Sequence, residues 1–310
     1  MRTGERGFAL IAVLLVLALL GVVGAEFAYS MRLEASSVRT YRDGIIAAHL
    51  AEAGVAQATR EIAADFAFAC MAEDHEVTFY QRDGRPVLRQ PRKKVQLGAG
   101  AFSYKLDDEE RLLNVNTATP DRLDRLFQSL GVEKADRDTL VDSIQDWRDP
   151  NEEHRVNGAE SEDTYLKLVV PYRSRNGNLE SVFELLQIKG VTPALFYGKD
   201  GKPGFSTVLT TRTPGQVNLN TADITVLRAI GLSEAEISQV FNTRRDGCFV
   251  TLPATGRFTG GGFVLTSRTF RVTAEGLVDG QVRARVTAVL QKRADAQGPS
   301  IAVLDWSTVD

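Results

Sequence analysis

The sequence predicts an α+β fold in which a long N-terminal helix packs on a small antiparallel sheet, with an α-helical domain inserted between the strands. Residues 8–25 are apolar throughout, and residues 26–66 contain no proline and repeat apolar side chains at helical spacing. Beyond this helix, segments of β type flank a region with the apolar period of helices. We therefore expect a leader (1–7), a membrane helix (8–25), an α/β domain (26–109 and 248–310) and a helical insert (110–247).

The membrane helix is predicted from length and charge. Its 18 apolar residues, counted from 8 to 25, approach the ~20 that a helix needs to cross a bilayer. The leader carries Arg2 and Arg6 against Glu5, and this small basic excess favours a cytoplasmic N-terminus. The chain is therefore expected to cross a membrane once.

Two processing routes are compatible with this end of the chain. A secretory signal could be cleaved before Glu26, because the small residues Val23 and Ala25 precede it. The apolar stretch is longer than the core of ~7–15 residues that such signals have. This end also resembles that of type IV pilins, which are cleaved at such a Gly-Phe junction. The resemblance implies cleavage between Gly7 and Phe8, which would leave the apolar helix attached, and we favour this route.

Residues 26–66 predict one continuous helix with an apolar face and a charged face. Gly44 and Gly54 would weaken this helix by about 1 kcal/mol each relative to alanine, so a bend at either position would be in keeping with them. The helix is interpreted as a stem that carries a folded head; a plain linker without an assembly role is the alternative. Its apolar face comprises Phe27, Met31, Val38, Tyr41, Ile45, Ala48, Val55, Ile62 and Phe66.

The sheet is predicted from five segments of β type. Residues 75–82 alternate in polarity, and residues 100–106 form a second candidate strand. Residues 268–278 and 281–292 are separated by Asp279-Gly280, which is a strong signal for a two-residue hairpin turn. Residues 301–306 form the last strand. Between these groups, residues 122–132, 138–148, 179–188 and 224–232 have the apolar spacing of helices.

The insert contains a repeat. Asn-x-Asn-Thr-Ala begins at Asn114 and again at Asn218, and each copy leads into a predicted helix that Thr117, Thr221 or a nearby aspartate could cap. Such segments resemble helix-hairpin-helix units, many of which bind the DNA backbone. Neither hairpin has a Gly-hydrophobic-Gly turn, and acidic side chains follow the first one. We therefore expect helix packing rather than nucleic-acid binding.

Residues 142–165 form an acidic loop. Calcium takes six to eight oxygen ligands from the carboxylates, amides and carbonyls of such loops. Asp149, Asn151 and Glu153 alternate as ligands in a tight loop can, and Glu160 with Asp163 could close the site from the far side. This spacing is not that of an EF-hand, and a solvated acidic loop is the alternative.

Composition excludes several other classes of function. The chain has 37 basic and 40 acidic residues, so no global charge recruits nucleic acid. Its three histidines and two cysteines show no spacing of zinc ligands and no nucleophile motif, so we expect no enzyme. Cys70 and Cys248 could form one disulfide, adding roughly 4–5 kcal/mol in the chain-entropy model, or remain two unpaired thiols.

Several motifs together resemble the minor pseudopilin K family of type II secretion systems over nearly the whole chain. They are the Gly7-Phe8 junction, Ala-Glu-Ala-Gly at 51–54, both Asn-x-Asn-Thr-Ala repeats, the acidic loop, Ser-Val-Phe-Glu-Leu-Leu-Gln-Ile-Lys-Gly-Val at 181–191, and Val-Leu-Asp-Trp at 303–306. Most pilin-type subunits carry a glutamate at the fifth mature position, which pairs with the N-terminal amine of a neighbouring subunit. Here that position is Ala12. The resemblance therefore implies a tip subunit, which cannot dock below another subunit although others can dock below it.

The resemblance further implies a pilin-like fold with an inserted helical domain and two calcium ions in the head. It implies cleavage by a prepilin peptidase, N-methylation of Phe8, and a single-pass protein of the bacterial inner membrane with a periplasmic head. Its partners would be pseudopilins I and J, possibly H, and the inner-membrane secretion platform. The calcium ligands would come from the loop between Asp149 and Asp163, where Pro150 and Asn151 replace expected aspartates, so one or two ions are expected. A membrane-anchored DNA-binding protein of the competence type is the alternative function.

Overall fold

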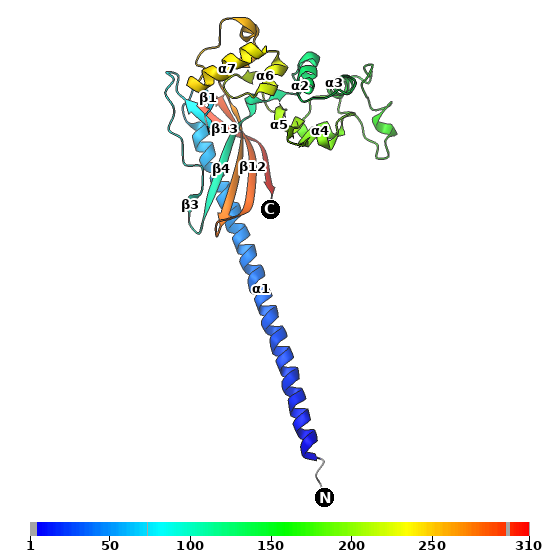
Figure 1. The fold of residues 1–310 in the computed structure, drawn as a ribbon, viewed down its shortest axis with the longest axis vertical. Helices are drawn as coiled ribbons and strands as arrows, with labels where there is room; N and C mark the ends of the chain where they lie inside the picture. The colour runs from blue at the N-terminus through cyan, green and yellow to red at the C-terminus, as the bar shows by residue number, and fades with distance from the viewer. Residues whose placement is uncertain (1–4, 73, 296–297, 310) are drawn as a thin grey trace.

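The computed structural model describes residues 5–72, 74–295 and 298–309, and confirms the predicted α+β fold. Its longest element is the helix α1 (Glu5–Ala63), which projects from the head as a rod (Figure 1). Every side chain from Phe8 to Arg42 is exposed, whereas one face of the helix is buried from Asp43 onward. The predicted membrane helix forms the free end of this rod, and residues 1–4 of the leader lie outside the described residues.

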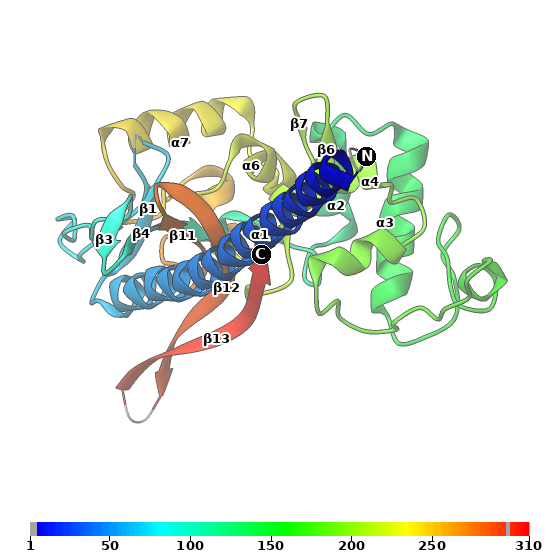
Figure 2. The ribbon, with the colours of Figure 1, turned by 90° about the horizontal axis from the view of Figure 1, so that it is seen from below.

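One face of a five-stranded antiparallel sheet packs against the upper half of α1, and Figure 2 shows the helix crossing it. Two of its neighbouring strands, which end at Val278 and begin at Gln281, are joined by the turn Asp279-Gly280. Both turn residues have positive φ, 53° and 76°, as the predicted hairpin turn requires. In sheet order the strands are β13 (Gly298–Val309), β12 (Gln281–Asp295), β11 (Thr269–Val278), β4 (Gly100–Asp108) and β3 (Val95–Leu97).

Small residues bring α1 close to the sheet. A Cβ atom on Gly276 of β11 would clash with the carbonyl oxygen of Ala47 in α1. Gly54 of α1 faces the same strand, and a Cβ there would lie 3.0 Å from the Cβ of Ala274. Gly54 therefore serves the helix–sheet contact within a helix that continues through it.

The stem helix ends three residues earlier than predicted, at Ala63 rather than near 66. Phe66 leaves the helical path and stacks on Phe79, with 4.1 Å between the ring centroids. Phe79 belongs to β2 (Val77–Tyr80), which pairs with β1 (Phe68–Met71) in a hairpin beside the end of α1. The predicted strand at 75–82 is thus shorter, and β1 was not predicted.

The helical insert covers the end of the head that lies farthest from the N-terminus (Figure 1). Its core includes Phe249, Phe258 and Phe263, so residues 248–265 pack with the insert, and the chain returns to the sheet later than the expected boundary at 248. The segment 179–188, predicted as an α-helix, forms only a 3₁₀ helix, which begins with a capping box of Ser181 and Glu184 and ends before Ile188. Its α-helices are α2 (Pro120–Ser129), α3 (Lys134–Arg148), α4 (Pro193–Tyr197), α5 (Phe205–Val208), α6 (Ile224–Ile230) and α7 (Glu234–Asp246).

Short elements complete the insert. Two-residue parallel strand pairs lead into the two repeats, and one antiparallel pair forms a small hairpin. The pairs are β5 (Leu113–Asn114) with β8 (Leu209–Thr210), β9 (Val217–Asn218) with β10 (Phe263–Val264), and β6 (Gly198–Lys199) with β7 (Lys202–Pro203). The 3₁₀ helices are η1 (Glu109–Arg111), η2 (Tyr165–Lys167), η3 (Val182–Gln187) and η4 (Gly256–Gly260).

Candidate assembly and cation-binding sites

The free end of α1 is the first candidate site, because no other part of the chain that the structure describes covers its apolar surface. Gly7, Phe8 and Ala12 all lie in this helix, and Phe8 is 77% exposed. The most apolar stretch near the N-terminus has a mean hydropathy of 3.0 and no buried residue, so the helix is long and apolar enough to span a membrane. Such a surface is stable only when lipid or other apolar helices cover it.

The helix caps of the two repeats differ from those predicted. Thr119, rather than Thr117, caps α2, and Asp223 caps α6. The prediction of Thr117 and Thr221 as caps was wrong, while the alternative of a nearby aspartate is confirmed for the second repeat. Thr221 instead donates to Asp108 at 2.6 Å, because the second repeat packs against the end of the sheet.

The second asparagine of each repeat binds a distant backbone segment in the same way. The side chain of Asn116 pairs with both the N–H and the carbonyl of Leu179, at 2.8 and 2.9 Å. The side chain of Asn220 pairs likewise with Phe249, at 2.8 and 3.0 Å. The repeated motif therefore holds loops onto the insert through backbone hydrogen bonds.

The helices α3 and α7 each carry, in the last turn, an arginine that binds backbone carbonyls of the preceding repeat. Arg148 donates to the carbonyls of Val115 and Ala118, and Arg244 donates to the equivalent carbonyls of the second repeat. Burial lowers the pKa of Arg148, and lowers the pKa of Arg244 to about 10. Since these cations are bound to the fold, they do not face a phosphate backbone, and a packing role is favoured.

The acidic loop is organised around Asp146, which is fully buried at the end of α3. Its carboxylate accepts the backbone N–H of Arg155 at 3.1 Å and that of Ala159 at 2.9 Å. A Cβ atom on Gly158 would clash with Oδ2 of Asp146, so only glycine permits this approach. Asp146 lies within the predicted acidic loop but was not among the predicted ligands, and Gly158, twelve residues later, is the signal that could have identified it.

The predicted metal ligands lie along this loop but form mostly local contacts. Asn151 donates to Asp149 at 2.7 Å, and the backbone N–H of Glu153 donates to Asn151 at 2.7 Å. The carboxylate of Asp163 accepts the backbone N–H of Glu160 at 2.9 Å. Among the described residues, no group of three or more carboxylate, imidazole or thiol side chains is arranged to hold a metal ion.

Glu160 is the most unusual of the predicted ligands. It is only 1% exposed, and its Oε2 accepts the hydroxyl of Ser174 at 2.7 Å. Its Oε1 is buried without a hydrogen-bond partner. Burial raises the pKa of Glu160 to about 7, and the nearby charges of Asp146, Glu152 and Asp149 add to this effect. A buried carboxylate oxygen without a donor, among other carboxylates, is suited to a cation.

An arginine supplies the positive charge within this group. The guanidinium of Arg155 lies 2.5 Å from Oδ1 of Asp146 and 2.6 Å from Oδ2 of Asp149. We call Asp146, Asp149, Glu152 and Glu160 the loop cluster. The residues therefore fit a hard cation in charge and in ligand type. Arg155 would compete with that cation, and Oε1 of Glu160 is the buried oxygen that has no hydrogen-bond donor among the described residues.

A second group of acids lies where the sheet meets the insert. Asp108, Glu109 and Glu110 are consecutive and buried, and we call them the junction cluster. Asp108 accepts hydrogen bonds from Asn218 at 3.0 Å and from Ser267 at 2.6 Å, in addition to Thr221. These contacts join the end of β4 to the second repeat and to the start of β11.

Glu109 and Glu110 each have hydrogen-bond partners of their own. Glu109 accepts from Arg271 at 2.7 Å and from Thr210 at 2.6 Å. Glu110 accepts the backbone N–H of Thr269 at 3.1 Å. Burial raises the pKa of Asp108 and of Glu110, and the neighbouring Asp108 charge raises that of Glu110 further.

The two cysteines are joined in the structure. Cys70 of β1 and Cys248, which follows α7, form a disulfide with 6.0 Å between their Cα atoms. The bridge spans 178 residues of sequence and ties the hairpin beside α1 to the insert. The hydrogen bonds of the junction cluster join the sheet to the insert at one place, and the disulfide adds a covalent link at another.

Sequence comparisons identify one group of relatives. Residues 104–197 match the family model described as type II secretion system (T2SS), protein K. A protein of Escherichia coli (strain K12) with the provisional name of type II secretion system protein K is 27% identical over 209 residues, or 63% of this chain. The type II secretion system protein K of Pectobacterium carotovorum subsp. carotovorum is 27% identical over 220 residues, also 63% of this chain. The matches span 61% of the length of these curated relatives.

Among solved structures, the fold is similar to a chain in the crystal structure of the GspK-GspI-GspJ complex from the type 2 secretion system of enterotoxigenic Escherichia coli. The two folds superpose with a TM-score of 0.54 at 17% sequence identity. The match covers 71% of this chain and 84% of that chain. At this identity the similarity establishes the shared fold.

Proposed function

We propose, from the confirmed resemblance to the protein K family of type II secretion systems, that this chain is a non-enzymatic minor pseudopilin at the tip of a secretion pseudopilus. It would help to start and cap the filament for protein export. The observation that carries this proposal is the exposed apolar end of α1, joined to a head with the matching fold. This end contains Ala12 where an acid would be needed to hold the amine of a further subunit.

The proposed mechanism is packing of apolar helices. The segment from Phe8 to Ala25 would pack against the corresponding helices of companion subunits within and above the membrane. The head is wider than the stem because the insert extends to one side of the sheet (Figure 2). This bulk would block addition of a subunit above, while the stem remains open to subunits below.

Processing and location follow from the same proposal. A prepilin peptidase would cleave between Gly7 and Phe8, and Phe8 would be N-methylated. The helix would lie in the bacterial inner membrane, with the head in the periplasm and contacts to the secretion platform. Pseudopilins I and J, and possibly H, would be its companions; the complex named for the similar structure supports I and J.

The test of this proposal is assembly in cells with the full-length chain. Gly7→Asp should leave the precursor uncleaved and abolish its co-purification with pseudopilins I and J, while Gly4→Asp should do neither. Ala12→Glu should restore a group that can hold a neighbour's amine, and cross-links between copies of this chain should then appear. Normal cleavage of Gly7→Asp, or a mature chain that begins at Glu26, would contradict the proposal.

We also propose that the acidic loop binds calcium, with one ion better supported than two. Calcium would be held by Glu160 and Asp149 together with neighbouring oxygens of the loop, and it would stiffen the head. The partnerless Oε1 of Glu160 supports this proposal, and the close contact of Arg155 with Asp146 and Asp149 explains why the ligands are not already gathered.

Calorimetry on the detergent-solubilised full chain tests the calcium site. Asp149→Ala should abolish the heat of calcium binding, whereas Asp136→Ala, an exposed carboxylate on the same side of the insert, should leave it unchanged. Arg155→Gln should strengthen binding, because it removes the competing cation. An unchanged heat in Asp149→Ala, or no heat with the parent chain, would refute the site.

A further inference from the structure

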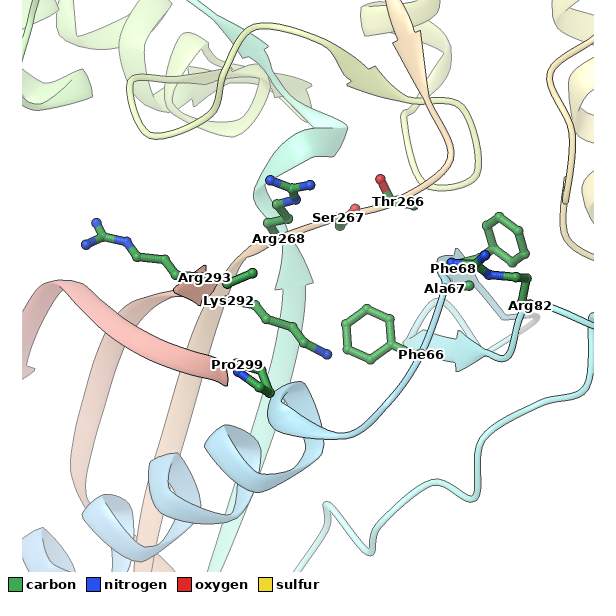
Figure 3. Close-up of a pocket in the computed structure, with 11 residues that line it drawn as sticks. Phe66, Ala67, Phe68, Arg82, Thr266, Ser267, Arg268, Lys292, Arg293 and Pro299 are labelled. Atoms are coloured by element: carbon green, nitrogen blue, oxygen red, sulfur yellow. The ribbon is translucent and has the colours of Figure 1, made fainter. Parts of the chain in front are cut away.

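A cavity of about 480 Å³ lies at the upper end of the stem, between the end of α1, the β1–β2 hairpin and the ends of the central strands. Figure 3 shows its lining, with Lys292 pointing toward the ring of Phe66 and Pro299 beside it. The Nζ atom of Lys292 lies 4.2 Å from the centre of that ring. The cavity therefore has an apolar floor with a cation held directly over it.

Three further basic residues line this cavity from separate segments, and Figure 3 shows the guanidinium of Arg293 pointing away from Phe66. Arg82 follows β2, Arg268 precedes β11 and Arg293 lies near the end of β12. None of the residues that line the cavity is acidic. Among the side chains that the structure describes, no carboxylate pairs with these three arginines, and only Arg293 has a side-chain partner, Gln291 at 2.8 Å. We call this cavity with its four cations the basic pocket.

Three described acids near the basic pocket have other partners or only a weak effect on it. Glu110 lies behind it and accepts the backbone N–H of Arg268, not its guanidinium. Asp108 is held by its three side-chain donors in the second repeat and before β11. Asp65 lies near enough to raise the pKa of Lys292, yet burial of Lys292 outweighs it and lowers that pKa. Among the described side chains, therefore, no ion pair joins these three acids to the cations of the pocket; the Nζ of Lys292 donates to the carbonyl of Ala64 at 2.6 Å.

The place of the basic pocket excludes a lipid headgroup as its partner. From Ala25 at the end of the apolar segment to Ala63 at the end of α1, the helix rises by roughly 57 Å. The pocket begins just beyond Ala63, so a membrane that holds residues 8–25 lies out of reach. Screening over a distance of about 10 Å at 0.1 M salt removes any long-range effect of lipid charge.

We propose that the basic pocket binds an acidic segment of another protein, through an aspartate or glutamate side chain with apolar neighbours. Guanidinium groups match the two oxygens of a carboxylate in geometry, and such charge-assisted hydrogen bonds are stronger than neutral ones. Phe66 and Pro299 offer an apolar surface to the residues beside the carboxylate. A cavity that combines cations with an aromatic floor suits such a peptide better than a fully hydrated anion.

Fluorescence anisotropy with the full chain in neutral detergent tests this proposal. The probe is a fluorescein-labelled peptide of alternating glutamate and leucine, and its matched control carries glutamine in place of glutamate. Arg268→Glu combined with Arg293→Glu should weaken binding of the probe by more than about tenfold, since hydrogen bonds to charged groups contribute roughly 1.5–3 kcal/mol. Arg82→Glu, a single exposed change on the other wall, should weaken it as well.

The matched control variant is Arg283→Glu, which makes the same charge change on an exposed residue of the same strand, β12, outside the pocket. It should bind the probe as the parent does. Equal binding of the glutamine peptide, equal loss in Arg283→Glu, or full binding by the double variant would overturn the proposal. Displacement of the probe by inorganic phosphate at the same concentration would identify a simple anion site instead. No companion subunit is needed for this test, so its result is independent of the proposed tip function.

Discussion

The junction cluster and the loop cluster both contain buried acids, all three residues in the first and Asp146 and Glu160 in the second, but they differ in how their oxygens are satisfied. In the junction cluster, Asp108 alone accepts hydrogen bonds from three side chains and one backbone amide. In the loop cluster, Glu160 has one side-chain donor and one buried oxygen without a partner. Both groups raise carboxyl pKa values through burial.

This difference separates a structural site from a candidate binding site. A buried polar group that has all its partners holds its surroundings in one arrangement. A buried oxygen that lacks a donor costs free energy until a cation or proton reaches it. The junction cluster therefore fixes the insert on the sheet, and the loop cluster is the place where a ligand can still add stability.

The largest effect is expected for Asp108→Ala. The change removes the acceptor of the buried Ser267 and Thr221 hydroxyls and one of the acceptors of Asn218, so the free energy of unfolding should fall by more than about 3 kcal/mol. Asp107→Ala is the control, because the Asp107 carboxylate binds only Lys105 at the surface and should matter by less than about 1 kcal/mol. Urea unfolding of the two variants gives the comparison, and similar midpoints would contradict a joining role for the cluster.

Asp146→Ala should have a smaller and more local effect. It removes the acceptor of two backbone N–H groups in the loop, which we expect to cost about 2 kcal/mol. Limited proteolysis should then cut the loop near residues 150–158 before the sheet unfolds. Glu153→Gln, whose side chain is exposed, is the control and should be cut no faster than the parent. Protection of the loop in Asp146→Ala would show that other contacts hold it.

Glu160→Gln should change how stability depends on pH. Because burial raises the folded-state pKa of Glu160 from 4.5 to about 7, its contribution is fully present below pH 4.5 and is lost as pH rises through 7. In chelator, the melting temperature of the parent should therefore fall between pH 5 and pH 8 by several degrees more than that of Glu160→Gln.

The junction cluster also makes the melting temperature depend on pH, equally in the parent and in Glu160→Gln. The informative quantity is therefore the difference in melting temperature between these two proteins at each pH. Glu162→Gln, an exposed neighbour paired with Arg173, should keep the slope of the parent. Added calcium should raise the melting temperature at pH 8 in the parent but not in Glu160→Gln. Parallel curves of melting temperature against pH for the parent and Glu160→Gln would mean that ionisation of Glu160 does not destabilise the fold.

The smallest effect is expected for Ser174→Ala. It removes the one side-chain donor to Glu160 and the contact between the hydroxyls of Ser174 and Ser161, so we expect a loss of about 1 kcal/mol in chelator. With calcium present the loss should shrink, because the ion would take over part of the charge. Thermal melts with and without calcium measure this, and an equal loss in both conditions would place the ion elsewhere.

The parts of the fold that the sequence predicted well depend on local patterns. The alternation of apolar residues around Asp279-Gly280 predicted β11, its turn and β12 almost to the residue, because the turn type needs residues that accept positive φ. The strand β1 was missed, since Phe68–Met71 shows no alternation and forms only by pairing with β2. The end of the insert was placed too early because residues 248–265 have no helical period but pack into the insert core.

The candidate site was predicted only in part, for a similar reason. Glu160 stood out in an acidic loop, but its burial depends on Ser174, which is fourteen residues away, and on the path that Asp146 imposes on the loop. Arg155 was not considered, although its contact with Asp149 decides what a cation must displace. Partner choice between distant charged groups is set by the folded path of the chain, which periodicity does not encode.

The bridge between Cys70 and Cys248 has a mechanical consequence. A pull on the stem reaches Cys70 through the short segment after Ala63, and the covalent bond passes the load directly to the end of α7. Tension carried along the backbone would then bypass the chain between the two cysteines, which contains β4 and both repeats, whereas β11, β12 and β13 follow Cys248. If the proposed filament moves this subunit, the bridge would therefore keep the insert in place on the stem even when contacts within the insert open.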